Sequence, residues 1–86
     1  MEIDKIYEDL EIIDIREEYL YNIKHLPGAR NISFYKLIGE PRKYLSKNKK
    51  YLLVCEYGIK SKKSSVILNN MGYNTYSLKG GAKNIM

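Results

Sequence analysis

The sequence has very few of the residues that build covalent or metal cross-links. Its 86 residues include one cysteine, Cys55, one histidine, His25, and no tryptophan. A lone thiol excludes an internal disulfide, and one cysteine with one histidine cannot supply the ligands of a zinc site. We therefore expect a fold held together by packing and hydrogen bonds, with no metal and no cofactor.

Long apolar runs and an export signal are missing as well. No apolar stretch approaches the roughly 18 residues of a membrane-spanning helix, and the N-terminus, Met-Glu-Ile-Asp-Lys, lacks the basic-then-apolar pattern of a signal peptide. Hydrophobic residues make up 44% and charged residues 29% of the chain, which is typical of a soluble globular protein. We expect one domain over residues 1–86, located in the cytoplasm and without a membrane partner.

Positive charge is in excess, with a formal net charge of +5. The basic residues are spread along the chain, and the densest clusters are Lys49-Lys50 and Lys60 with Lys62-Lys63. No basic stripe interleaved with aromatic residues is present, so a nucleic-acid partner is not expected.

Short apolar runs typical of buried strands alternate with segments of helical periodicity. This order predicts an α/β fold with a small parallel sheet flanked by helices. We expect strands at 12–15, 50–54 and 74–78, and helices at 17–23, from Phe34 onward after a Ser33 cap, and at 61–71. Gly72 is placed where a helix stops in the left-handed conformation. Short links between the elements favour parallel strands, in which functional residues follow the carboxyl ends of the strands.

Cys55 follows such a strand and begins a short loop that leads into a helix. Backbone N–H groups of such a loop, together with the positive end of the helix dipole, form an anion site that stabilises a thiolate. Gly58 allows an unusual backbone conformation or a close approach, and Ser61 can both cap the helix and reach the pocket. An ionised thiol needs no general base, so His25 is assigned a structural role beside the Pro27-Gly28 turn.

Several segments together resemble the single-domain rhodanese family, the thiosulfate sulfurtransferase-like proteins. They are Asp14-Ile15-Arg16-Glu17, Lys24-His25-Leu26-Pro27-Gly28-Ala29-Arg30-Asn31-Ile32, Val54-Cys55-Glu56-Tyr57-Gly58-Ile59-Lys60-Ser61, Leu68-Asn69-Asn70-Met71-Gly72-Tyr73 and Tyr76-Ser77-Leu78-Lys79-Gly80-Gly81. Each motif is weak alone, but their order and spacing cover nearly the whole chain.

The resemblance implies a rhodanese-like fold and a sulfurtransferase. Cys55 would accept a sulfane sulfur from thiosulfate, a polysulfide or a protein persulfide, and would pass it to a thiophilic acceptor, which is a small molecule or a protein thiol. The residues that would bind the sulfur or its donor are Glu56, Tyr57, Gly58, Ile59, Lys60 and Ser61. Asp14 and Arg16 would support the site as an ion pair or hydrogen-bond network.

Three positions depart from the family pattern. Lys24 replaces the usual glycine, and Lys60 stands where many members have arginine, which loses planar two-point recognition of an oxyanion. Glu56 places a carboxylate directly after the thiol. If it faces the pocket it repels thiosulfate, and if it faces solvent it does little; the sequence leaves both orientations open.

Three other functions compete with the sulfurtransferase. A cysteine phosphatase needs the pattern Cys-x5-Arg, but the sixth residue after Cys55 is Ser61, and all arginines precede the loop. A non-catalytic rhodanese-like binding module often has the cysteine replaced, whereas Cys55 is present. A persulfide carrier fed by a protein donor shares the chemistry and stays open. The sequence does not indicate the oligomeric state.

Overall fold

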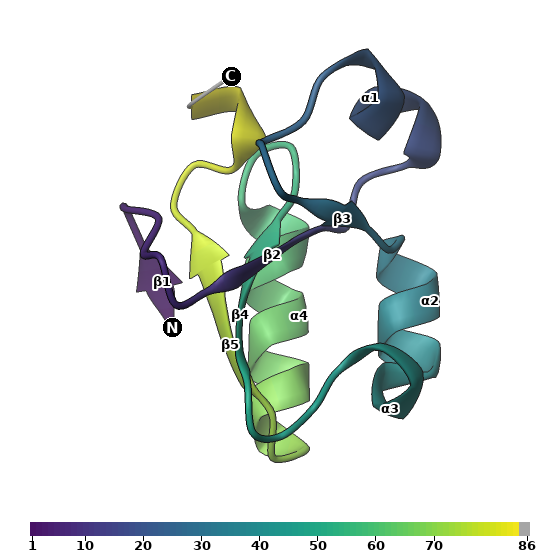
Figure 1. Cartoon of the computed structure of the whole chain (residues 1–86), viewed down its shortest axis with the longest axis vertical. Coiled ribbons are helices and arrows are strands. Elements are labelled where there is room, and N and C mark those ends of the chain that lie inside the picture. Colours follow the sequence, from purple (N-terminus) through teal and green to yellow (C-terminus); the bar gives the residue numbers. More distant parts are fainter. Residues whose placement is uncertain (85–86) are drawn as a thin grey trace.

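The most apolar segment of the chain forms the central strand of the sheet. In the computed structural model, which describes residues 1–84, β4 (Lys50–Val54) pairs with β2 (Glu11–Asp14) and β5 (Asn74–Leu78). Two short strands, β1 (Glu2–Ile3) and β3 (Arg30–Asn31), form the edges. The five-stranded order is β1-β5-β4-β2-β3, and every pair is parallel (Figure 1). The predicted α/β class with a small parallel sheet is confirmed.

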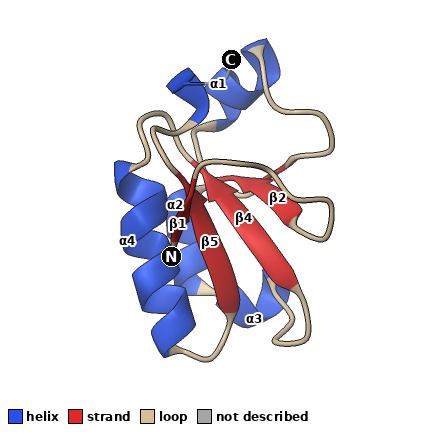
Figure 2. Cartoon of the chain, turned by 90° about the vertical axis from the view of Figure 1, so that its left-hand side faces the viewer, coloured by secondary structure: helices blue, strands red, loops and turns tan. Residues whose placement is uncertain are grey.

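Helices cover one face of this sheet and one end of it. The helical segments are α1 (Glu18–Ile23), α2 (Phe34–Gly39), α3 (Pro41–Tyr44), α4 (Ile59–Asn70) and a 3₁₀ turn at Ala82–Asn84. Figures 1 and 2 show α2, α3 and α4 on the same face, with α1 and the 3₁₀ turn beyond the carboxyl ends of the strands. No helix within residues 1–84 is long and apolar enough to cross a membrane.

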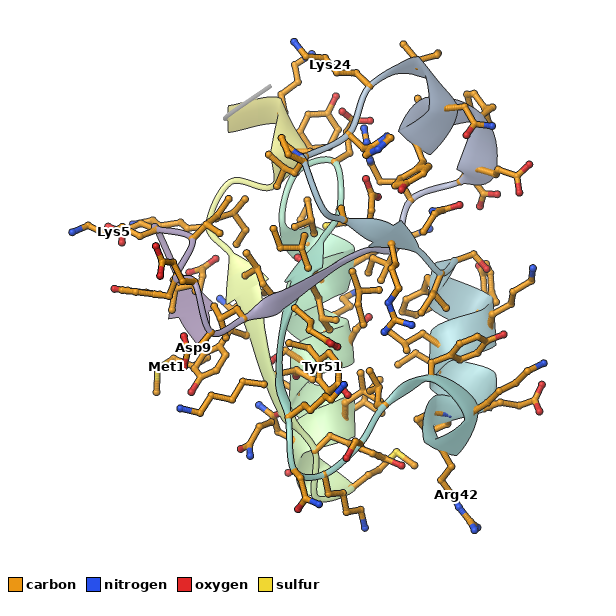
Figure 3. All side chains as sticks on the ribbon, in the orientation of Figure 1. Met1, Lys5, Asp9, Lys24, Arg42 and Tyr51 are labelled. Carbon is orange, nitrogen blue, oxygen red and sulfur yellow. The ribbon has the colours of Figure 1, made fainter. Side chains whose placement is uncertain are left out.

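From Tyr51 to Val54, strand β4 is buried on both faces, which explains the apolar run there. Tyr51 and Leu53 join the core under the helices, whereas Leu52 and Val54 join the core on the opposite face. Figure 3 shows Tyr51 between the sheet and the helices, while Lys5, Lys24 and Arg42 extend from the surface. The same alternation turns Cys55 toward the helix-covered core, where it is counted with Leu53.

The predicted strands and helices are present, with differences at their ends. Helix α4 begins at Ile59, two residues before the prediction, with Gly58 as its N-cap. Ser61 therefore lies inside the first turn and is not the cap. Ser33 precedes α2 as expected but makes no side-chain capping hydrogen bond. Gly72 has the expected left-handed conformation, with φ +99°.

Two features of the fold were not predicted from sequence. The short helix α3 was not predicted; it begins at Pro41, because proline is well suited to the first position of a helix. The edge strand Glu2–Ile3 was also missed, since two residues carry too little periodicity to be recognised.

The turn after β5 packs directly on the loop that contains Cys55. Ala82 N–H donates to Cys55 O at 2.7 Å, and Lys83 N–H donates to Glu56 O at 3.0 Å. Directly before these two residues, Gly81 has φ +69°, and a Cβ atom there would lie 2.5 Å from Cys55 O and 2.6 Å from Gly58 N. Only a residue without a side chain allows this approach, so Gly81 helps to set the shape of the loop.

We predict that Gly81→Ala disrupts this contact. Gly28 also has a left-handed φ, +82°, but nothing lies within 4 Å of its Cβ position, so Gly28→Ala is a matched control for backbone strain. We expect Gly28→Ala to cost about 1–2 kcal/mol and Gly81→Ala more than about 3 kcal/mol of unfolding free energy, because loop backbone must also move. Urea unfolding of both variants measures the difference. Equal losses would contradict the close packing of this turn.

Candidate functional site

Cys55 lies at the carboxyl end of the central strand, immediately before the loop that leads into α4. Its side chain is 5% exposed, and the residue is free of any disulfide. The loop needs only three further residues, because Gly58 adopts φ +91° and reverses the chain before Ile59 begins the helix. A Cβ on Gly58 would lie 3.2 Å from Gly80 N and 3.3 Å from Leu78 O. The loop is thus bent by one glycine and held from behind by the turn after β5.

The bend directs hydrogen-bond donors at the sulfur. Gly58 N–H donates to Cys55 Sγ at 3.1 Å, and Ser61 N–H donates to it at 3.2 Å. Ser61 Oγ also lies 3.2 Å from Sγ; the thiol donates in its neutral form, and the hydroxyl can donate to a thiolate. The N–H groups in the first turn of a helix have no partner within the helix, so they are available for this purpose. Together with the dipole of α4, they favour negative charge on the sulfur.

A cavity of about 340 Å³ opens beside the thiol. It lies between the loop after β4 and the segment that runs from β2 into α1. The lining residues are Ile15, Arg16, Glu17, Leu20, Cys55, Glu56, Tyr57, Ile59 and Lys60. Cys55 is therefore a nearly buried group that faces a cavity large enough for a small molecule, with inward-facing amides behind it.

A fixed positive charge stands in the wall of this cavity. Arg16 Nη2 lies 2.8 Å from Asp14 Oδ2, and the side chains of this pair are 7% and 1% exposed. Arg16 Nε also donates to both carboxylate oxygens of Asp14, and Nη2 donates to Lys24 O at 2.7 Å. Asn31 Nδ2 donates to the backbone oxygens of both residues of the pair. The guanidinium is consequently held in one orientation.

The surroundings of Arg16 keep it charged. The hydrogen bonds to Asp14 raise the pKa of Arg16 above its usual value, whereas burial lowers it. The negative charges of Asp14, Glu56 and Cys55 raise the pKa further. Arg16 is thus the cation that faces both the thiol and the carboxylate in this cavity.

Glu56 and Lys60 both belong to the cavity wall, but their charges have different neighbours. Glu56 is half-buried and is one of the residues that line the cavity, and its negative charge lies close enough to Arg16 to raise the pKa of that guanidinium. Lys60 lines the cavity as well, but its Nζ lies over the rings of Phe34 and Tyr35, 5.5 Å and 5.8 Å from their centroids. The lysine charge is therefore directed toward aromatic faces of α2.

Most of the residues singled out from the sequence come together here. Glu56, Tyr57, Ile59 and Lys60 line the cavity with Cys55, while Gly58 and Ser61 contact the sulfur from behind. Sequence reasoning missed the apolar wall formed by Ile15 and Leu20 and the nearby Glu17. These residues were assigned to a strand and a helix, and nothing in the pattern indicated that α1 turns them toward the thiol.

Outside the cavity, His25 has a local role, as expected. Its ring stacks on Tyr21 with centroids 3.7 Å apart, and its Nδ1 lies 2.8 Å from Tyr21 O. Within the part of the chain that the structure describes, no three histidine, cysteine or acidic residues are arranged to hold a metal ion.

The family model of the rhodanese-like domain matches residues 2–86 of this chain. Among curated proteins, the putative sulfurtransferase YtwF of Bacillus subtilis is 31% identical over 74 residues, which covers 86% of this chain and 71% of that protein. The tRNA uridine(34) hydroxylase of Rickettsia rickettsii is 31% identical over 80 residues, covering 86% of this chain. This chain spans about a third, 32%, of the length of that hydroxylase.

Solved structures give the same result. A rhodanese-related protein from Thermoplasma volcanium superposes with a TM-score of 0.82 and 26% identity, covering 90% of this chain and 76% of that one. A rhodanese-like domain protein from Staphylococcus aureus gives a TM-score of 0.78 and 25% identity, covering 90% and 74%. With the family match over nearly the whole sequence, the chain belongs to the rhodanese-like domain family.

Proposed function

We propose that this chain is a sulfurtransferase that moves a sulfane sulfur from a donor to a thiophilic acceptor through a persulfide on Cys55. The observation that carries the proposal is the set of N–H groups of Gly58 and Ser61 directed at Sγ, 3.1 Å and 3.2 Å away. The family membership and the likeness to a putative sulfurtransferase support the same chemistry.

The reaction consists of two displacements. In the first, the Cys55 thiolate attacks the sulfane sulfur of a donor such as thiosulfate; a new S–S bond forms, the old one breaks, and sulfite leaves with the electron pair. In the second, a nucleophilic acceptor attacks the outer sulfur of the persulfide, and the electron pair returns to Cys55. No external oxidant or reductant is needed, because the sulfur transfers without a net change at the cysteine.

The charges and the burial of the cavity wall suit both displacements. The outer sulfur of a persulfide carries negative charge and would extend from Sγ toward the space lined by Arg16 and Tyr57. Arg16, fixed by Asp14, would attract an anionic donor, while the loop amides would stabilise the thiolate at the start and end of each cycle. The low exposure of Cys55 keeps water from competing for the persulfide.

Glu56 favours one variant of this function, a persulfide carrier that receives sulfur from a protein. Glu56 is one of the residues that line the cavity, and its negative charge would oppose the entry of a dianion such as thiosulfate. The likeness to tRNA uridine(34) hydroxylases covers about a third of their length, so it supports the shared domain and does not extend to their complete activity.

The first test is direct detection of the persulfide. We expect intact-protein mass spectrometry after incubation with thiosulfate or a polysulfide to show the gain of one sulfur atom, which cyanide then removes. Because Cys55 is the only cysteine, the Cys55→Ser variant is a complete control and should gain nothing. Sulfur transfer retained by Cys55→Ser would contradict the mechanism.

Glu56→Gln should improve the reaction with thiosulfate, since it removes a negative charge from the cavity wall. We expect kcat/KM for thiosulfate to rise about three- to tenfold. Glu18→Gln makes the same change in net charge at an exposed residue that does not line the cavity, so it should have little effect. Equal rates for both variants would mean that Glu56 does not act on the donor.

Ser61→Ala should slow persulfide formation, because the hydroxyl next to Sγ is lost. A hydrogen bond to a charged group is worth about 1.5–3 kcal/mol, so we expect kcat/KM to fall about tenfold or more. Ser64→Ala is the matched control: its Oγ donates to Lys60 O at 2.8 Å, and the residue is buried on the same helix. Similar rates in the two variants would remove the serine hydroxyl from the mechanism.

A further inference from the structure

Helix α4 buries mainly small polar side chains and exposes large apolar ones. The residues that it buries against the sheet are Ser61, Ser64, Ser65 and Leu68. The large apolar side chains on its outer side are exposed: Ile59 by 63%, Val66 by 57% and Ile67 by 41%. Soluble helices normally bury their apolar stripe, so a face of this kind indicates that something else covers it.

The buried serines do not need apolar neighbours, because their hydroxyls are hydrogen-bonded. Ser65 Oγ donates to Thr75 O at 3.0 Å, and Thr75 Oγ1 donates to Ser65 Oγ at 2.9 Å. Asn69 adds a donor and an acceptor to the same strand residue. This network holds α4 to β5. The outer apolar residues are therefore not required to attach the helix.

The outer residues of α4 form part of a groove. Ile59, Lys62, Lys63, Val66 and Ile67 follow one another at helical spacing, so they share one face. With Glu2, Tyr57 and Gly58 they line a groove of about 650 Å³. Figure 2 shows α4 at the margin of the molecule, with its far side directed away from the sheet. We call this surface the α4 groove.

The α4 groove adjoins the cavity of Cys55. Tyr57 and Ile59 line both, and Tyr57 is 62% exposed. A molecule bound along α4 would therefore reach the residues at the mouth of the thiol cavity. This position suits a partner that exchanges sulfur with Cys55.

The charges of the groove favour a partner with acidic side chains. Lys62 and Lys63 are exposed, and neither forms an ion pair with another residue in the range 1–84. One acid, Glu2, also lines the groove. A two-fold contact with a second copy would bring the lysines of both copies together, which is unfavourable. The apolar residues between the lysines favour a protein over a nucleic acid, whose binding surfaces are dominated by charge.

We propose that the α4 groove docks an acidic segment, anchored by apolar side chains, of the protein that exchanges sulfur with Cys55. The role of this partner in sulfur exchange rests on the proposed function, whereas the docking itself does not. The lysines would attract the acidic side chains, and Ile59, Val66 and Ile67 would bury the apolar ones.

The docking is tested first without sulfur chemistry. The Cys55→Ser protein is titrated with a synthetic peptide of leucine and glutamate at helical spacing, and with a matched peptide that has lysine at every glutamate. We expect NMR shifts at residues 57–67 with the acidic peptide, and an affinity at least about tenfold above that of the basic one, weakening as salt rises. Equal affinities, or shifts on another face, would overturn the proposal.

Charge reversal then locates the contact. Lys62→Glu with Lys63→Glu should abolish the preference for the acidic peptide. Lys43→Glu with Lys47→Glu changes the net charge equally near α3, where these lysines line a separate groove, and should preserve the preference. The proposal fails if both pairs act alike, or if a single-stranded RNA shifts residues 57–67 and the acidic peptide does not.

A last experiment joins docking to transfer. Wild-type protein loaded with sulfur is offered either the acidic peptide with a terminal cysteine or cyanide, and the ratio of the two rates is compared with that of the Lys62→Glu, Lys63→Glu variant. We expect this ratio to fall about tenfold in the variant; an unchanged ratio would overturn the partner role. Absence of a persulfide in the wild type, with peptide binding intact, would instead refute the proposed function.

Discussion

The thiol site of this small domain depends on two main-chain N–H groups that point at one sulfur atom. The amides of Gly58 and Ser61 reach Cys55 Sγ only because the loop turns inward at Gly58, where φ is +91°. That turn is supported from behind by Gly81, whose missing side chain lets the backbone after β5 touch the loop. The thiol site therefore depends on contacts between segments that are distant in sequence, and not on the loop alone.

The charges around the thiol are balanced within the cavity wall. Arg16, immobilised by Asp14, places a permanent cation beside the thiol, and Glu56 places an anion in the same space. Lys60 does not supply the planar recognition that an arginine would give, and its ammonium group lies over the rings of Phe34 and Tyr35. In the proposed reaction, the anion of Glu56 weakens the attraction of strongly anionic donors, which connects the electrostatics of the cavity to the choice of sulfur donor.

Helix α4 connects the thiol site to the outer surface. Its first turn supplies the Ser61 donors, its inner face is attached to β5 through Ser65 and Thr75, and its outer face is apolar and basic. Because hydrogen bonds attach the helix to the sheet, its large apolar residues remain available for a partner. One helix thus serves the thiol on its N-terminal side and, in our proposal, the sulfur-exchanging protein along its length.

The sequence alone determined the α/β class, the central strand and the position of Cys55 before a helix, because these depend on local apolar runs and on the order of short motifs. It also indicated Gly58 and Ser61 as parts of the loop. Tertiary structure decided that Glu56 lines the cavity, how Arg16 is held by Asp14, and that Leu20 of α1 lies in the cavity wall beside the thiol. The physical reason is that an apolar run encodes burial, whereas the direction of a side chain depends on which distant backbone packs against its own.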